Sequence, residues 1–156
     1  MKNIGIDVGW TIKGIKGEEG KKNEPMPHSF DVIKKIVKEF DNVYLISKAD
    51  SRQKAEVEEW LFQNYFFEIT GVKHGNLYFC YERRDKSIFA KGLELNYFID
   101  DRPEVMYHLP FYILKYLISA SKEDLDKFKD KAISNLTIVK DWLEIEYHLF
   151  HNIPDY

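Results

Sequence analysis

The chain has 156 residues, of which 44% are hydrophobic and 31% are charged, and its formal net charge is −3. This balance is ordinary for one soluble domain, and the net negative charge argues against a general nucleic-acid-binding surface. The single cysteine, Cys80, excludes an intramolecular disulfide and any zinc site built on several cysteines, and it favours a cytoplasmic location.

The N-terminal part of the chain predicts a strand, a polar loop and a helix. Residues 3–8 form a short apolar run without helical spacing, which indicates a strand. A polar stretch with several glycines and two prolines follows, and it predicts a hairpin or flap over residues 12–28. Ser29 is the expected N-cap of a helix that extends to residue 40, and residues 43–46 are the next strand.

The rest of the chain continues this alternation. The apolar stretch 109–120 is interrupted by Lys115 and is too short to cross a bilayer, so it is interpreted as a buried helix. Residues 121–131 are strongly charged and are expected to be a solvated segment. The other expected elements are helix 50–65, strand 76–81, helix 86–93, strand 96–99, helix 103–108, strand 136–139 and helix 142–150.

Alternating strands and helices predict parallel β-α-β crossovers. The expected fold is therefore an α/β, Rossmann-like domain over residues 1–156. Its doubly wound, mainly parallel sheet would have about five strands, and the spacing leaves no room for a large cap domain.

Polar side chains follow several of the predicted strands. Asp7 and Ser47 come at the ends of the first two, Lys86 follows the third, and Asp100 and Asp101 follow the fourth. Ligands of open parallel sheets bind beyond the carboxyl ends of the strands, so these side chains should meet at one edge. Clustered carboxylates without histidine or cysteine favour Mg²⁺, and a lysine and a hydroxyl beside it suit a phosphoryl group.

This ordered set resembles the haloacid dehalogenase-like superfamily, whose best-known members are Mg²⁺-dependent phosphatases. The first motif of that superfamily, Asp-x-Asp-x-Thr, is similar to DVGWT, which holds Asp7 and Thr11. The later motifs are similar to LIS and to ERRDKSIFAKGLELNYFIDDR, which hold Ser47, Lys86, Asp100 and Asp101. The stretch RRDKS…FIDDRPE and the tail VKDWLEIE look most like capless or small-cap members, including the 5′(3′)-deoxyribonucleotidase-type group.

The resemblance implies a hydrolase of the phosphoric monoester type and a role for each matching residue. The catalytic residues would be Asp7, Ser47 and Lys86. Asp7 would be the nucleophile and would form an aspartyl-phosphate, Ser47 would hydrogen-bond a phosphoryl oxygen, and Lys86 would neutralise the nucleophile and the transferred group. The Mg²⁺ ligands would be Asp7, the backbone carbonyl of Gly9, Asp100 and Asp101. Thr11 would support the turn after the first strand, and the candidates for contact with the phosphate or substrate are Thr11, Ser47, Lys48 and Lys86.

Gly9 departs from the superfamily pattern. The second aspartate of the first motif serves family phosphatases as general acid and base, and Gly9 has no side chain for either role. Since such help is typically worth about 10²–10⁴-fold, turnover of ordinary phosphomonoesters should be weak. Three outcomes stay open: a leaving group that needs no proton, a proton donor in the 13–28 segment or in a partner, or a site that binds without efficient turnover.

Several alternatives stay open on the sequence alone. A capless site would accept a phosphorylated small molecule or the accessible end of a macromolecule, and a homo-oligomer could cover it. A catalytically impaired metal-binding, phosphate-binding or regulatory module is the second hypothesis. IGIDVGWT also resembles the first phosphate-binding strands of actin-like, heat-shock-protein and sugar-kinase ATPases, but that fold needs two such domains and a longer chain.

Overall fold

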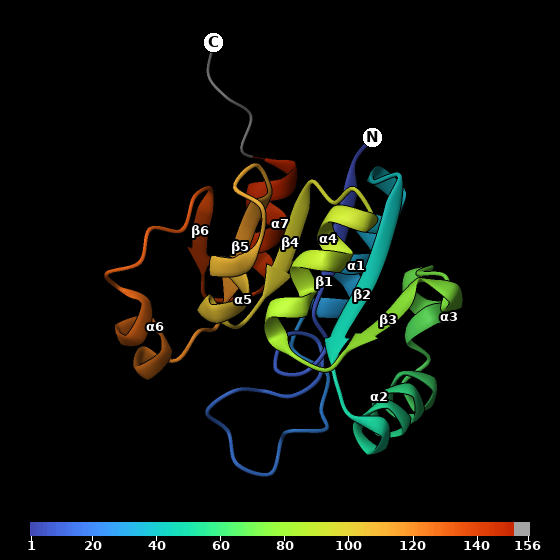
Figure 1. Ribbon diagram of the computed structural model, residues 1–156. Helices are drawn as coiled ribbons and strands as arrows, with labels where there is room; N and C mark the ends of the chain where they lie inside the picture. The colour runs from blue at the N-terminus through green and yellow to red at the C-terminus, as the bar shows by residue number, and fades with distance from the viewer. Residues whose placement is uncertain (152–156) are drawn as a thin grey trace.

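The computed structural model describes residues 1–151 and shows a parallel sheet between two layers of helices (Figure 1). Six strands pair in the order β3-β2-β1-β4-β5-β6, and every neighbouring pair is parallel. The strands are β1 (Asn3–Ile6), β2 (Asn42–Lys48), β3 (Leu77–Cys80), β4 (Tyr97–Asp100), β5 (Leu114–Ile118) and β6 (Leu136–Val139). The expected α/β class with a doubly wound parallel sheet is confirmed, with one strand more than expected.

The helices divide between the two faces of the sheet, as Figure 1 shows. They are α1 (Ser29–Glu39), α2 (Ser51–Gln63), α3 (Phe66–Thr70), α4 (Lys86–Gly92), α5 (Pro103–His108), α6 (Lys122–Phe128) and α7 (Trp142–Phe150), with short 3₁₀ turns at His74–Asn76 and Arg83–Asp85. Because successive strand residues point to opposite faces, Ile4 and Ile6 pack toward α1 and α7, whereas Phe98 and Leu117 pack toward α4 and α5. Two apolar cores therefore hold the sheet from both sides.

Gly5 allows the two central strands to pack closely on the α4 face. A Cβ atom at Gly5 would lie 2.7 Å from Leu95 Cδ1 and 2.9 Å from Phe98 Cε2, which is closer than such atoms can approach. The Phe98 ring therefore occupies the space beside β1. The Lys86 ammonium lies 6.0 Å from the centroid of the same ring, so this packing also helps to place the first residue of α4.

The interpretation of residues 109–120 as a buried helix is wrong. Residues Leu114–Ile118 form β5, between β4 and β6. Lys115 is buried in this strand, and its ammonium donates hydrogen bonds to three backbone carbonyls, those of Pro110, Ile113 and Ser134, at 2.8–3.0 Å. A continuous apolar run has no period that separates a buried strand from a buried helix, and this explains the error.

One smaller expectation is wrong, and two short helices were not expected. Ser29 is not an N-cap, because α1 begins at Ser29, His28 precedes it in the left-handed conformation, and no side chain caps the helix. Residues Phe66–Thr70 form the unexpected helix α3. The charged segment 121–131 contains α6, in which the Ser121 side chain accepts a hydrogen bond from the Asp124 backbone N–H.

The segment 7–28 between β1 and α1 lies below the carboxyl ends of the strands in Figure 1. It doubles back on itself, since Gly14 N donates to Glu24 O, Ile15 N donates to Lys21 O, and Met26 N donates to Ile12 O. No large cap domain is present in residues 1–151, and the 7–28 segment, α2, the Arg83–Asp85 turn and the start of α5 flank the carboxyl ends of the strands. Within the same residues, no helix is long and apolar enough to cross a bilayer.

Candidate active site

Asp7 lies directly after β1, at the point where the strand order of the sheet reverses. Its backbone N–H donates to Ile99 O at 2.9 Å, which continues the pairing of β1 with β4 by one residue. Its buried carboxylate accepts two hydrogen bonds, from Thr11 Oγ1 to Oδ2 at 3.0 Å and from Lys86 Nζ to Oδ1 at 2.8 Å. Ligands of doubly wound folds bind at this position, so Asp7 stands where a ligand is expected.

The Lys86 ammonium lies between the carboxylates of Asp7 and Asp100, at the ends of β1 and β4. Lys86 is the first residue of α4, its side chain is 2% exposed, and its ammonium also donates to Asp100 Oδ2 at 2.7 Å. Burial alone would lower the pKa of Lys86, but the carboxylates of Asp100 and Asp7 outweigh it and raise that pKa. Lys86 is therefore held as a cation beside Asp7, where it can neutralise a nucleophile or a bound phosphoryl group.

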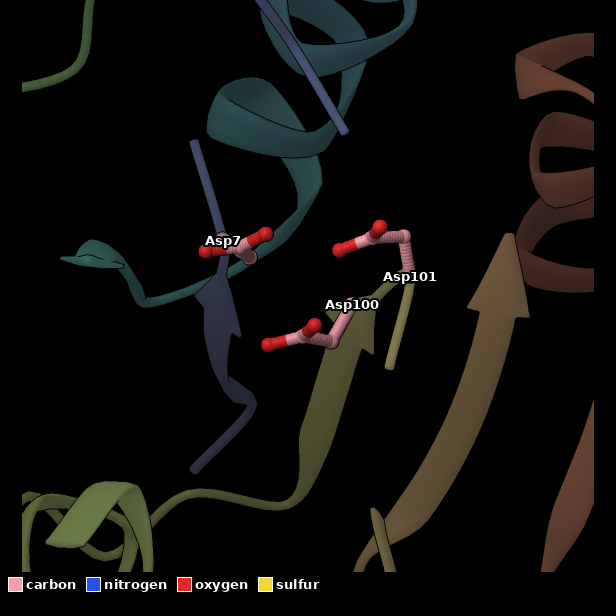
Figure 2. A group of neighbouring side chains, drawn as sticks. All are labelled: Asp7, Asp100 and Asp101. Atoms are coloured by element: carbon pink, nitrogen blue, oxygen red, sulfur yellow. The ribbon is translucent and has the colours of Figure 1, made fainter. Parts of the chain in front are cut away.

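Asp100 and Asp101 complete a cluster of carboxylates with Asp7. Figure 2 shows the three side chains between the ends of β1 and β4, and one oxygen of each lies within 4.8 Å of the others. Asp100 Oδ1 accepts a hydrogen bond from the Arg102 backbone N–H at 3.0 Å. The Asp101 carboxylate accepts from Lys16 Nζ at 2.7 Å, so a lysine of the 7–28 segment reaches into the cluster.

The potential ligand atoms of the cluster fit a hard divalent cation. All the side-chain donors are carboxylate oxygens, and no backbone hydrogen bond within residues 1–151 uses the Gly9 carbonyl oxygen. Burial raises the pKa of Asp100 to about 8, and the charge of neighbouring Asp7 adds to the rise. Burial also raises the pKa of Asp7, although the Lys86 ammonium opposes it. A divalent cation would stabilise these ionised carboxylates, so the cluster is suited to Mg²⁺.

Gly9 is required neither by backbone conformation nor by space. Its φ does not lie in the left-handed region, unlike that of Gly14, Gly17, Gly20 and Gly71. A Cβ atom at Gly9 would have no neighbouring atom within 4 Å. An L-residue can therefore stand here without strain in the backbone or a clash at its Cβ atom.

An open cavity of about 250 Å³ lies over the cluster. Gly9, Ser47 and Lys86 line it together with the three aspartates, and several further cations surround it, namely Lys13, Lys48, Arg83 and Arg102. A cavity with a carboxylate floor and a cationic wall can hold a metal ion and an anionic group together.

The structure brings together all but one of the residues that the sequence predicts for the cavity. Ser47 and Lys48 are the last residues of β2, and no hydrogen bond within residues 1–151 engages the Ser47 hydroxyl. Thr11 is completely buried, donates to Asp7 and does not line the cavity. Its position suits orientation of the Asp7 carboxylate, the supporting role, and does not suit direct contact with a phosphoryl group.

Other cavity residues were missed by sequence reasoning. Trp10, Lys13 and Glu56 line the cavity, and Lys16 contacts Asp101. No motif marks them, because the path of the 7–28 segment and the placement of α2 bring them to the site. The signal available in the sequence was the position of Trp10 inside the first motif, between Gly9 and Thr11.

A curated protein is similar in sequence to part of this chain. No protein-family model matches the chain. A protein from Bacillus cereus named "Putative nucleotidase" is 22% identical over 126 residues, in an alignment that covers 67% of this chain. The chain spans 65% of the length of that curated relative.

Solved structures of phosphatases share the fold. The D,D-heptose 1,7-bisphosphate phosphatase from B. bronchiseptica, complexed with magnesium and phosphate, has a TM-score of 0.69 at 11% identity, over 98% of this chain and 100% of that one. The same enzyme from Burkholderia thailandensis has a TM-score of 0.67 at 10% identity, over 97% and 100%. The cobalt-bound deoxy-D-mannose-octulosonate 8-phosphate phosphatase from Haemophilus influenzae has a TM-score of 0.54 at 11% identity, over 96% and 86%.

These likenesses define the class of fold. The chain has the α/β fold of these metal-bound phosphatases, without a large cap within residues 1–151. These likenesses confirm the expected α/β fold, and the resemblance to the haloacid dehalogenase-like superfamily rests on the motifs around Asp7, Lys86 and Asp100.

Proposed function

We propose that this chain is a Mg²⁺-dependent phosphohydrolase of the haloacid dehalogenase-like type that acts through an aspartyl-phosphate on Asp7. The observation that carries the proposal is the buried cluster at the switch point, where the Lys86 ammonium lies between Asp7 and Asp100. The fold of the solved metal-bound phosphatases supports the same conclusion. The name of the Bacillus cereus relative supports a nucleotidase-like substrate range.

The chemistry consists of two displacements at phosphorus. An Asp7 carboxylate oxygen attacks, the bond from phosphorus to the alcohol oxygen breaks, and that oxygen leaves with the electron pair and takes a proton from solvent. Water then attacks the phosphorus of the aspartyl-phosphate, the bond from phosphorus to the Asp7 oxygen breaks, and the carboxylate is restored. Hydrogen phosphate leaves, and the second proton of the attacking water returns to solvent. Lys86 and Ser47 would stabilise the phosphoryl oxygens, and a bound Mg²⁺ would neutralise charge on those oxygens and on Asp7.

The absence of an acid at Gly9 makes slow turnover the expected behaviour. No side chain at this position can protonate the departing oxygen or activate the water of the second step. The same observation favours the second candidate function, a module that keeps the metal site and binds phosphorylated ligands without turning them over.

Phosphate release from a substrate panel tests the proposed function. The panel contains 4-nitrophenyl phosphate, nucleoside monophosphates and sugar phosphates, each assayed with Mg²⁺ and with EDTA. We expect slow release that EDTA removes and added Mg²⁺ restores, because the carboxylate cluster has no catalytic use without a cation. Release that is indifferent to EDTA would contradict the proposal. No release over the whole panel, with Mg²⁺ binding retained, would favour the binding module.

Lys16 should compete with the metal for Asp101. Its ammonium lies 2.7 Å from Asp101 Oδ2, with side-chain exposures of 25% for Lys16 and 3% for Asp101. Because a partly exposed ion pair is worth up to about 1 kcal/mol, Lys16→Met is expected to tighten Mg²⁺ binding by about two- to fivefold. Calorimetric titration of the metal-free protein with MgCl₂ measures the change.

The matched control is Lys22→Met, which removes the same charge from the same loop without a contact to the cluster. We expect it to change Mg²⁺ affinity by much less than Lys16→Met does. Equal Mg²⁺ affinities for the wild type and both variants would show that Lys16 does not compete with the metal for Asp101.

The substrate would be a phosphorylated small molecule or the accessible end of a macromolecule, because no cap within residues 1–151 limits its size. A homo-oligomer that covers the site and a cytoplasmic location stay predictions from the sequence.

A further inference from the structure

Trp10 is held in an unfavourable backbone conformation at the mouth of the cavity. Its φ of 59° lies in the left-handed region, which is an outlier for a bulky residue. The residue is 36% exposed, although tryptophan is usually well buried, and it lines the same cavity as Asp7 and Ser47. Strained residues persist where the surrounding structure fixes them, and they cluster at ligand-binding sites.

The surrounding loop fixes the position of the Trp10 ring. A Cβ atom at Gly14 would lie 2.9 Å from Trp10 Cε3 and 3.1 Å from Cζ3, so the indole edge rests on the bare backbone of Gly14. The Trp10 backbone N–H donates to Lys13 O at 2.7 Å, which closes the turn beneath it. The ring is thus presented by a tight turn rather than left on a loose loop.

The indole N–H of Trp10 differs from the other two in the chain. Trp60 Nε1 donates to Asn23 O at 2.7 Å, and Trp142 Nε1 donates to Thr11 O at 2.8 Å. Within residues 1–151, no hydrogen bond engages the Trp10 indole N–H. Trp60 and Trp142 serve the core, whereas Trp10 has both an aromatic surface and a donor available to a ligand.

The rest of the cavity wall offers charge rather than apolar surface. Its cations suit the phosphoryl group, and its aliphatic residues are limited to Val57 and Val105. Since there is no large cap within residues 1–151, a substrate group beyond the phosphate would contact only the elements that line the cavity, which include the 7–28 segment and α2. Trp10 is the large aromatic side chain on that wall.

We propose that Trp10 is a specificity-determining residue that selects phosphomonoesters carrying a flat aromatic group, which stacks on its indole ring. This inference rests on the proposed function, because it assumes that the phosphoryl group binds at Asp7. The ligands that this site would select share an aromatic ring a short distance from a phosphate group. A nucleobase and a simple aryl group both provide it, and the experiment distinguishes these two sources.

The test uses phosphonates, which bind like phosphates but cannot be turned over. The first pair is benzylphosphonate and ethylphosphonate, and the second is the 5′-phosphonate analogue of adenosine and that of ribose. Each is titrated calorimetrically into the protein in the presence of Mg²⁺. Stacking of a base on an aromatic side chain should make the ring-bearing member of a pair bind about five- to a hundredfold more tightly.

Variants of Trp10 connect that preference to this residue. Trp10→Leu should abolish the preference for the ring-bearing phosphonate, and Trp10→Phe should keep most of that preference. Trp10→Gly removes the ring and relieves the left-handed strain, so it keeps the test valid if the leucine variant folds poorly. Tyr65→Leu is the matched control, because Tyr65 is also an exposed aromatic residue with positive φ but does not line the cavity.

The outcomes separate this inference from the function on which it rests. A ring preference in the adenosine pair alone assigns a nucleotide, and one in the benzyl pair alone assigns an aryl phosphate; either supports the inference if Trp10→Leu removes it. Equal binding within both pairs, or a preference that survives Trp10→Leu and Trp10→Gly, overturns it. If none of the four probes binds with Mg²⁺ present, the proposed function fails, and the inference fails with it.

Discussion

Asp7→Asn should reduce Mg²⁺-dependent phosphate release to background, a loss on the order of 10⁴- to 10⁶-fold, because an amide oxygen is a poor nucleophile. The substitution keeps the shape of the side chain. It also leaves Lys86 with its bond to Asp100 at 2.7 Å, so that this ammonium is not left without a buried partner. Rates of phosphate release at saturating Mg²⁺ measure the effect.

Folding of the Asp7→Asn variant is not expected to suffer. Burial raises the pKa of Asp7, which means that the ionised carboxylate is disfavoured where it lies, and a neutral amide removes that cost. Asp126→Asn is a suitable control, since Asp126 is exposed on α6, away from the cavity, and should leave activity unchanged. Metal-dependent activity that survives Asp7→Asn at the wild-type level would exclude Asp7 as the nucleophile.

Gly9→Asp should raise the hydrolysis of alkyl phosphates by about 10²–10⁴-fold, because it restores a general acid and base beside Asp7. The structure accepts the change, since a Cβ atom at Gly9 meets nothing within 4 Å and the backbone there is not left-handed. The gain should be smaller in the first chemical step of 4-nitrophenyl phosphate hydrolysis, because 4-nitrophenolate leaves without a proton. Steady-state and burst kinetics with the two substrates measure the difference.

The isosteric control is Gly9→Asn, which fills the same space but cannot supply a proton. We expect it to give no gain. If Gly9→Asp folds, binds Mg²⁺ and is no faster than the wild type, the missing acid is not the limiting defect. Either another group already donates the proton, or the site serves binding.

The parts of the site that could be predicted from the sequence are those fixed by topology. Asp7, Ser47 and Asp100 each come at the end of a strand with a clear apolar pattern, and parallel strands bring their carboxyl ends to one edge. Lys86 was predictable because the stretch ERRDKS after the third strand resembles the lysine motif of the superfamily. The order β3-β2-β1-β4 then places β1 and β4 side by side, and the carboxylates of Asp7 and Asp100 meet at Lys86.

The parts that could not be predicted depend on contacts between distant segments. The apolar run that contains β5 has no period of its own, and its pairing with β4 and β6 joins segments that are distant in the sequence. The contact of Lys16 with Asp101 spans 85 positions and depends on the path of an irregular loop. The strained φ of Trp10 is likewise imposed by the turn between Val8 and Gly14, which no propensity scale describes.

The open space beside the Gly9 Cα atom bears on why this position holds a glycine. A glycine in a tight turn is usually explained by its backbone, but here neither φ nor a neighbouring atom requires it. The loss of the acid is therefore a matter of chemistry and not of folding. It follows that a single substitution can test whether this site is an impaired phosphatase or a working one with another proton donor.

The most direct test of the account is a crystal structure with Mg²⁺ and beryllium fluoride, which mimics a phosphoryl group on an aspartate. We predict that BeF₃⁻ is bonded to an Asp7 carboxylate oxygen and contacted by Lys86 and Ser47. We also predict that Mg²⁺ is held by Asp7, the Gly9 carbonyl and the pair Asp100-Asp101. A structure in which Mg²⁺ and BeF₃⁻ are absent from this cluster, with Asp7 and Asp101 still paired to Lys86 and Lys16, would contradict it.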